Sequence, residues 1–502
     1  MSGQLIIERT TKLLDRLNEI LSSIDNSIVY KNIISATILS LSEPCRLAIT
    51  GRVKSGKSSL INVLLGGDYA KVGISETTAT INIFKYGKPD NIEKPILCEY
   101  ISGDKQWIPS ADLDSLQGTS QEVIDRISQI KTLTYFLQDE RLKNVTLIDT
   151  PGIDAVVGCD GDAHQQQTEA FLGLRRQHKE QTIELSNNAD AVILLLGDVA
   201  HESDKDFIDG FLRNRGTQSS VNTIGILSQI DLTDERICNR TSNAQERFET
   251  LSSYVNCVVP ISSGIKRYLP TLDEAKIIRK ILLKLPSKQT LDYMLFGGPK
   301  MYFKPSIAGI ELTLEERQKI YWHKDMPFRC FAVIAKKLYE KEPNEAIEEL
   351  NEISGIDNLK LILDQHFFKR CYHIKAEIAI KQALRVIWDF MNCTIDQYRD
   401  SNNHIDQISS SIREIQKEFE ILYQESGDEN RYFQALILLV ENESLFSKAE
   451  KEELSKLFSN NSVQFDNQRL NYWFAQSNTH INEIRRELAH LAYNKYTDIA
   501  FQ

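Results

Sequence analysis

The chain has 502 residues, of which 26% are charged and 41% belong to the hydrophobic set, and these values are ordinary for a soluble globular protein. A chain of this length can bury a large core and is expected to divide into two or three domains. The net charge of −11 argues against a bulk nucleic-acid-binding protein. The eight cysteines are scattered without a C-x-x-C pair, which favours reduced thiols over a zinc site or a disulfide framework.

The first predicted element is an amphipathic helix near the N-terminus. Leu14, Leu17, Leu21 and Ile24 follow a spacing that places them on one face of a helix. A stripe of this kind is more typical of the core of a helical bundle than of a partner-binding surface. We therefore assign residues 1–43 to a helical segment that packs with helices from the C-terminal part of the chain.

A phosphate-binding loop follows at residues 51–58, which read G-R-V-K-S-G-K-S and fit the pattern G-x-x-x-x-G-K-S. The apolar residues 46–50 before it predict a buried parallel strand, and residues 58–65 after it have helical spacing. The N–H groups of such a loop and helix point at phosphate oxygens. The sequence therefore predicts a nucleoside triphosphate site, in which Lys57 bridges the β- and γ-phosphates and Ser58 ligates Mg²⁺. The further nucleotide contacts expected in this loop come from Gly51, Ser55, Gly56 and Ser59.

Two further segments are expected to complete the phosphate and magnesium site. The strand predicted at residues 145–149 ends in D-T-P-G, so that Asp149 can hold a magnesium-bound water and the Gly152 amide can contact a γ-phosphate. Between the loop and this strand, one of Thr77 or Thr78 is placed to close over the Mg²⁺. Spacing does not choose between the two threonines.

Recognition of the base is expected after a later strand, residues 222–227, which is followed by S-Q-x-D. GTPases usually carry N-K-x-D or T-K-x-D there, and the Asp carboxylate accepts both guanine N1–H and N2–H. Asp231 is retained, so we expect guanine. Gln229 replaces the lysine whose stem lies along the base, which predicts weaker affinity and selectivity.

A fifth element follows directly. Residues 254–260 predict another strand that ends in I-S-S-G, and the backbone amides around Ser262 and Ser263 are expected to meet guanine O6. Five elements in this order resemble a GTPase domain, an α/β fold with a mostly parallel sheet and flanking helices. We therefore expect GTP as substrate, GDP as product and Mg²⁺ as cofactor.

The subfamily can be narrowed further. The segments G-R-V-K-S-G-K-S-S-L-I-N, T-T-A-T-I-N-I-F-K-Y-G and D-T-P-G-I-D resemble the bacterial dynamin-like GTPases, and the resemblance covers residues 45–265 at the level of motifs. It implies nucleotide-dependent pairing of GTPase domains into a homodimer or a higher assembly, and often work on membranes. It also makes a bacterial protein the expectation, and the scattered cysteines favour a cytoplasmic one. Contact with the inner face of the membrane, and assembly with a paralogue, stay open.

The centre of the phosphate loop departs from the animal dynamins, which carry Gln-Ser where this chain has Val53 and Lys54. Ras-like enzymes orient the attacking water with a Gln after D-x-x-G, but here Ile153 follows Gly152. One hypothesis is that the Lys54 ammonium neutralises charge at the phosphates in the transition state. The alternative is that Lys54 points to solvent or pairs with a carboxylate. The residues expected to take part in hydrolysis are therefore Lys54, Lys57, Thr77 and Thr78.

After the fifth element, residues 266–355 predict a mostly helical insertion, because a helix resembling the last one of many GTPase domains arrives only at residues 355–363. Within the insertion, residues 293–304 combine aromatics, glycines and lysines. They predict either a membrane wedge or a loop packed against the core, and the packed loop is favoured. The GTPase domain with its insertion is assigned to residues 44–370.

Residues 371–502 predict a C-terminal helical bundle or stalk that includes the N-terminal helix. Long amphipathic helices are expected at residues 372–398, at residues 405–422 and, at the end of the chain, around residues 481–491. The corners between helices are expected at Gly427 and residues 459–462.

Two classes of function stay open. In a mechanochemical dynamin-like GTPase, turnover per molecule rises with protein concentration because GTPase domains pair across the nucleotide. In a regulatory GTPase switch, the helices bind a protein effector and turnover per molecule is constant. A third class, a nucleotide-binding module without hydrolysis, ranks last because Lys57, Ser58 and Asp149 are intact. No nucleic-acid partner is expected.

Overall fold

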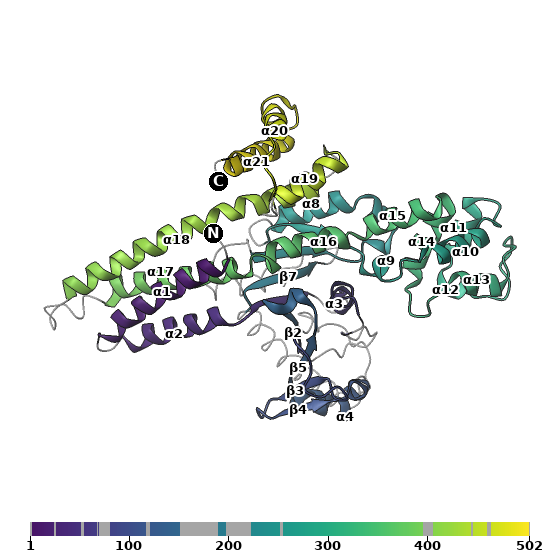
Figure 1. Cartoon of the computed structure of the whole chain (residues 1–502). Helices are drawn as coiled ribbons and strands as arrows, with labels where there is room; N and C mark the ends of the chain where they lie inside the picture. The colour runs from purple at the N-terminus through teal and green to yellow at the C-terminus, as the bar shows by residue number, and fades with distance from the viewer. Residues whose placement is uncertain are drawn as a thin grey trace.

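Figure 1 shows a computed structural model of the chain, with a central sheet, an elongated helical bundle on one side of it and a compact group of helices on the other. The structure describes residues 3–24, 27–51, 55–67, 69, 81–116, 121–150, 189–196, 222–251, 255–394, 405–442, 445–458 and 463–500.

The described strands form one nine-stranded sheet in the order β4-β3-β5-β2-β6-β1-β7-β8-β9. The strands β6, β1, β7, β8 and β9 run parallel to one another, whereas β2 is antiparallel to β6, and β3 is antiparallel to both β4 and β5. The prediction of a mostly parallel sheet with flanking helices is confirmed. The strands are β1 (Cys45–Gly51), β2 (Ile81–Tyr86), β3 (Ile96–Tyr100), β4 (Lys105–Ile108), β5 (Ile130–Leu137), β6 (Val145–Asp149), β7 (Ala191–Leu196), β8 (Thr223–Leu227) and β9 (Val258–Pro260).

Strands β1, β6, β7 and β8 are apolar because both of their faces are buried, as is typical of parallel strands covered by helices. The predicted strand at residues 254–260 was too long, since β9 begins only at Val258. The shorter helical elements around the sheet are α3 (Lys57–Leu65), η1 (Ser110–Leu116), α4 (Gln121–Gln129), η2 (Glu140–Lys143), η4 (Ile230–Leu232), α7 (Asp234–Cys238) and α8 (Arg240–Leu251).

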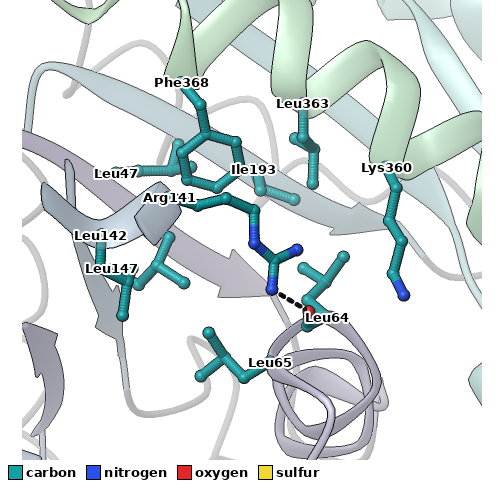
Figure 2. A pocket seen from close by; sticks show the side chains of 10 residues that line it. All are labelled: Leu47, Leu64, Leu65, Arg141, Leu142, Leu147, Ile193, Lys360, Leu363 and Phe368. Carbon is teal, nitrogen blue, oxygen red and sulfur yellow. Dashed lines mark hydrogen bonds between the residues drawn. The ribbon is translucent and has the colours of Figure 1, made fainter. Parts of the chain in front are cut away.

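The C-terminal end of α3 is held by an arginine from η2. The Arg141 guanidinium donates a hydrogen bond of 2.8 Å to the Leu64 carbonyl oxygen and one of 2.9 Å to Asp139. A cation at this end of a helix complements the helix dipole. Figure 2 shows Arg141 among apolar side chains, with Leu363 and Phe368 above it. The cavity there measures about 20 Å³, which is room for about one water molecule, so we assign no ligand to it.

The inserted helices after β9 have a hydrophobic core of their own, distinct from that of the sheet. The segment at residues 293–304 is helical rather than a loop, because it contains the end of one helix (Lys288–Phe296) and the whole of the next (Gly298–Tyr302). Tyr302 is fully buried, whereas Phe296 is 92% exposed. The helices are α9 (Ser263–Arg267), α10 (Leu272–Leu282), α11 (Lys288–Phe296), α12 (Gly298–Tyr302), α13 (Leu314–Ile320), α14 (Phe328–Glu340) and α15 (Pro343–Ser354), after which α16 (Ile356–Leu363) packs on the sheet.

Helices from both ends of the chain share one hydrophobic cluster, in which Leu14 and Leu17 contact the group that contains Ile380 and Phe419. Figure 1 shows these helices extending away from the sheet, opposite to the insertion. The bundle consists of α1 (Gly3–Ser22), α2 (Ile28–Ser42), α17 (Cys371–Asp389) and α18 (Ile405–Glu441). The remaining elements are η5 (Asp364–Phe368), η6 (Phe390–Thr394), α19 (Lys448–Phe458), α20 (Asn467–Thr479) and α21 (Glu483–Ala500). The domain boundaries stay predictions.

Two details of the predicted C-terminal helices are wrong. The corner expected at Gly427 is not formed, because α18 continues through this position to Glu441. Ile481 precedes α21 and is 97% exposed, so it is not part of that helix's buried stripe. The corner expected at residues 459–462 lies outside the described residues. None of the described helices is both long and apolar enough to cross a membrane.

Candidate nucleotide-binding site

The parallel pairing of β1 with β6 brings the phosphate loop and Asp149 to the same edge of the sheet. Ile49 is paired with Asp149 in the register of these two strands, and the loop begins at Gly51 where β1 ends. Residues at the carboxyl ends of neighbouring parallel strands face the same crevice. Two motifs that are about a hundred residues apart in the chain therefore line one site.

Glycine is required at the first position of the loop. Gly51 has φ +152°, and a Cβ built on it would lie 2.8 Å from both Cβ and O of Leu195 and 3.1 Å from Oγ of Ser55. A contact of 2.8 Å with the backbone oxygen of the neighbouring β7 cannot be relieved by a side-chain rotation. The close passage of the loop across the sheet edge therefore depends on the absence of a side chain.

Lys57, the first residue of α3, folds back over the loop. Its Nζ donates a hydrogen bond of 3.0 Å to the Gly51 carbonyl oxygen. Burial lowers the pKa of Lys57 to about 8, and the nearby charge of Asp149 opposes this change. The ammonium is thus held against the first residue of the loop.

Asp149 is buried, with an exposed fraction of 4%, and Nδ2 of Asn82 donates a hydrogen bond of 3.3 Å to its Oδ2. These two residues are direct partners in the antiparallel pairing of β2 with β6. Burial raises the pKa of Asp149 to about 6, although Lys57 and Asn82 act to lower it. Asn82 was missed as a site residue. The sequence feature that could have indicated it is a polar side chain inside the apolar segment I-N-I-F.

Several polar atoms at this edge are buried without a hydrogen-bond partner in the part of the chain that the structure describes. They are Oδ1 of Asp149, Oγ of Ser55 and Oγ1 of Thr50. Buried polar atoms are normally paired, and a bound ion or ligand would satisfy these oxygens. A carboxylate oxygen and hydroxyl groups next to an ammonium suit Mg²⁺ with phosphate oxygens. Ser58 and Ser59 are half-buried in the first turn of α3.

The base-recognition residues predicted from the sequence are brought together. Ser262 Oγ donates a hydrogen bond of 2.6 Å to Oδ1 of Asp231 and accepts one of 3.1 Å from the Ile265 amide. Ser263 is the first residue of α9, which contacts α3. Gln229 has φ 59°, and its Nε2 lies 3.9 Å from a Cβ built on Gly56. The base motif therefore adjoins the phosphate loop.

Two residues of the insertion, which sequence reasoning did not find, also contact Asp231. Arg329 Nε donates a hydrogen bond of 2.9 Å to Oδ2, and the Cys330 thiol donates one of 3.2 Å to the same oxygen. Arg329 is 98 residues from Asp231 in the chain, and no local motif indicates the contact. The predicted site residues Lys54, Thr77, Thr78 and Gly152 lie outside the described residues.

Comparison with known proteins agrees with the motifs. Residues 47–230 match the dynamin family. Dynamin-like protein 2 of Campylobacter jejuni is 28% identical over 256 residues, which are 51% of this chain but 36% of that protein, so the chain spans about a third of this relative. Isoniazid-induced protein IniC of Mycobacterium tuberculosis is 24% identical over 368 residues, or 69% of this chain and 68% of IniC.

Solved structures show a more distant likeness. An oligomerised bacterial dynamin pair, for which long-range sensing and tethering of membranes is described, is aligned over 97% of this chain and 90% of its own, with 13% identity and a TM-score of 0.35. Era in complex with MgGDPNP and a segment of 16S ribosomal RNA is aligned over 49% of this chain and 69% of its own, with 16% identity and a TM-score of 0.25.

Proposed function

We propose that the chain, whose residues 47–230 match the dynamin family, binds and hydrolyses GTP with Mg²⁺ and acts through nucleotide-dependent self-association. The observation that carries the proposal is the group at the carboxyl ends of β1 and β6. There Lys57 is hydrogen-bonded to the loop, and Asp149 and Ser55 have buried oxygens without partners among the described residues. This arrangement supports the proposal of a charged ligand with oxygen atoms at this edge of the sheet.

The residues divide the work by position. The phosphates would be held by Lys57 and by the loop residues Gly51, Ser55 and Gly56. Mg²⁺ would be held directly by Ser58 and, through a water molecule, by Asp149. The bound Mg²⁺ would neutralise charge on the phosphate oxygens. For this role Asp149 must be ionised, and Asn82 supports the ionised form by donating to Oδ2.

The remaining predicted residues extend the proposal. Lys54 would add a positive charge at the transition state, one of Thr77 or Thr78 would cover the metal, and the Gly152 amide would contact the γ-phosphate. In a Lys54→Ala protein we expect slower hydrolysis with GTP binding retained. A parent rate of hydrolysis in this variant contradicts the role of Lys54.

The helical bundle is suited to carry a change at the nucleotide to the rest of the molecule. The ammonium of Lys375, a buried residue of α17, donates to the carbonyl oxygen of Glu43, and it lies 3.5 Å from that of Pro44. These carbonyls directly precede β1, whose other end forms the phosphate loop. A shift of β1 would therefore reach α17 through this contact, and the bundle would move with respect to the sheet.

The test is GTP turnover per molecule across a hundredfold range of protein concentration, with ATP and the Lys57→Ala protein as controls. We expect turnover per molecule to rise with concentration, because paired GTPase domains complete the site. Constant and slow turnover would favour the regulatory switch and a search for a protein effector. Equal turnover of ATP and GTP would contradict guanine recognition by Asp231.

Partners are the second part of the proposal. A membrane surface or a paralogous chain would join the assembly, with the protein in the cytoplasm at the inner face of the membrane. Sedimentation with liposomes, in the presence and absence of a non-hydrolysable GTP analogue, tests the membrane partner. The same protein recovered in the supernatant under both conditions would remove the membrane from the proposal.

A further inference from the structure

The carboxylate expected to read the base is already engaged by the protein. Asp231 is 3% exposed. Its Oδ1 accepts from Ser262, and its Oδ2 accepts from both Arg329 and Cys330. A carboxylate oxygen has two lone pairs, so Oδ2 is saturated and Oδ1 has one acceptor position left. Guanine offers two donors, N1–H and N2–H. Asp231 can accept only one of them while it keeps its hydrogen bonds with Ser262, Arg329 and Cys330.

Helix α14 is docked closely on the base-recognition elements. It contacts both η4, which contains Asp231, and α9, which follows the loop at Ser262. A Cβ built on Gly264 would lie 2.4 Å from the Cys330 sulfur, so this glycine leaves the space that the thiol occupies. Cys330 is fully buried, and burial together with the neighbouring Asp231 raises the pKa of its thiol. The thiol therefore stays protonated and donates.

Arg329 differs from Cys330 in its freedom to move. Its side chain is 39% exposed, whereas Asp231 and Cys330 are buried. A guanidinium presents planar N–H donors to a carboxylate, as the N1–H and N2–H edge of guanine does. Arg329 can thus satisfy Asp231 in the absence of base and rotate toward solvent when the base binds.

We propose that Arg329 is a specificity-determining residue that occupies the guanine-binding carboxylate of Asp231, so that guanine binds in competition with the contact between α14 and η4. This inference rests on the proposed function. Displacement of Arg329 by the base loosens the N-terminal end of α14. Binding of the base thereby changes the packing of the inserted helices. This change is separate from any movement of the sheet when the phosphates bind.

The first test is the dissociation constant for a fluorescent GTP analogue and for the corresponding inosine analogue, which lacks the N2 amino group. In the Arg329→Ala protein we expect GTP to bind about tenfold more tightly, because a charge-assisted contact no longer competes. The gain for the inosine nucleotide is expected to be smaller, because it cannot donate through N2. Lys336→Ala is the matched control, since Lys336 is a cation of the same helix that pairs with Asp234 and Asp292.

The second test uses the wild-type chain and does not depend on a variant. Hydrogen exchange at the start of α14 is expected to be faster with the GTP analogue bound than without nucleotide. Equal or weaker GTP binding by Arg329→Ala overturns the competition, and so does unchanged exchange in α14. Failure of the proposed function looks different, because then neither the wild type nor any variant binds GTP.

Discussion

The close approach of Gly355 to the base loop gives a prediction whose size can be estimated from the structure. Gly355 separates α15 from α16 with φ +66°, and a Cβ built on it would lie 2.2 Å from the Pro260 carbonyl oxygen. Pro260 is the last residue of β9, and the Ser262 amide donates to the Ser354 carbonyl oxygen at 2.9 Å. A Gly355→Ala substitution therefore pushes α16 away from the loop that carries Ser262.

Two costs contribute to the expected effect. An L-residue in the left-handed region costs about 1–2 kcal/mol. Crowding in a packed interior costs about 1–3 kcal/mol, and here the obstructing atom belongs to the backbone and cannot rotate away. We therefore expect the opening free energy of β9 and α16 to fall by about 2–5 kcal/mol in the Gly355→Ala protein.

Gly309→Ala is the matched control, because Gly309 has φ +77° but no atom within 4 Å of the added Cβ. This variant has only the cost of the left-handed backbone conformation, so we expect its local opening free energy to fall by about 1–2 kcal/mol. The assay is hydrogen exchange read by mass spectrometry, which gives opening free energies for separate segments. Equal losses in the two variants would refute the reasoning, since the contact with Pro260 would then contribute nothing. We also expect weaker GTP binding in Gly355→Ala alone.

Two further predictions concern buried charges. Because burial raises the pKa of Asp149 to about 6, its carboxyl is protonated below that pH and must lose a proton to hold Mg²⁺. Mg²⁺-dependent GTP binding should therefore weaken about tenfold for each pH unit below 6. The measurement is a Mg²⁺ titration at several pH values. If the affinity of the Asp149→Asn protein falls with pH as steeply as that of the wild type, this carboxyl is not the cause. In the C-terminal helices, Arg485→Met leaves the Glu450 carboxylate, 8% exposed, without its ion-pair partner, which should cost about 3–5 kcal/mol. Adding Glu450→Gln should restore part of this loss in urea unfolding, and an unchanged loss in the double variant would show that the ion pair is not its source.

Local patterns in the sequence are most informative where one segment contains all the residues of a motif. The loop from Gly51 to Ser58 is recognisable because its glycines, lysine and serine stand at the fixed spacing G-x-x-x-x-G-K-S. Asp149 could be placed beside it because parallel strands align their carboxyl ends, and the register of β1 with β6 shows this. Asp231 and Ser262 were each predicted at the end of a strand, and the structure adds a direct hydrogen bond between them.

The long helix α18 shows a limit of local signals. A glycine in a helix costs about 1 kcal/mol relative to alanine, which made Gly427 a reasonable corner. The helix continues through it, because buried residues before and after it, such as Phe419 and Leu439, belong to packed clusters of the tertiary structure. Packing over many residues outweighs one unfavourable propensity.

The sequence by itself determined the α/β class, the phosphate loop and the expected reading of guanine, because each of these depends on residue types at short and regular spacings. Only the tertiary structure decided which distant residues reach the same atoms. Asn82 joins Asp149 through the pairing of two strands, and Arg329 reaches Asp231 because the inserted helices fold back over the base loop. Such contacts have no signature in a single sequence, since they depend on how complete elements pack rather than on the order of neighbouring residues.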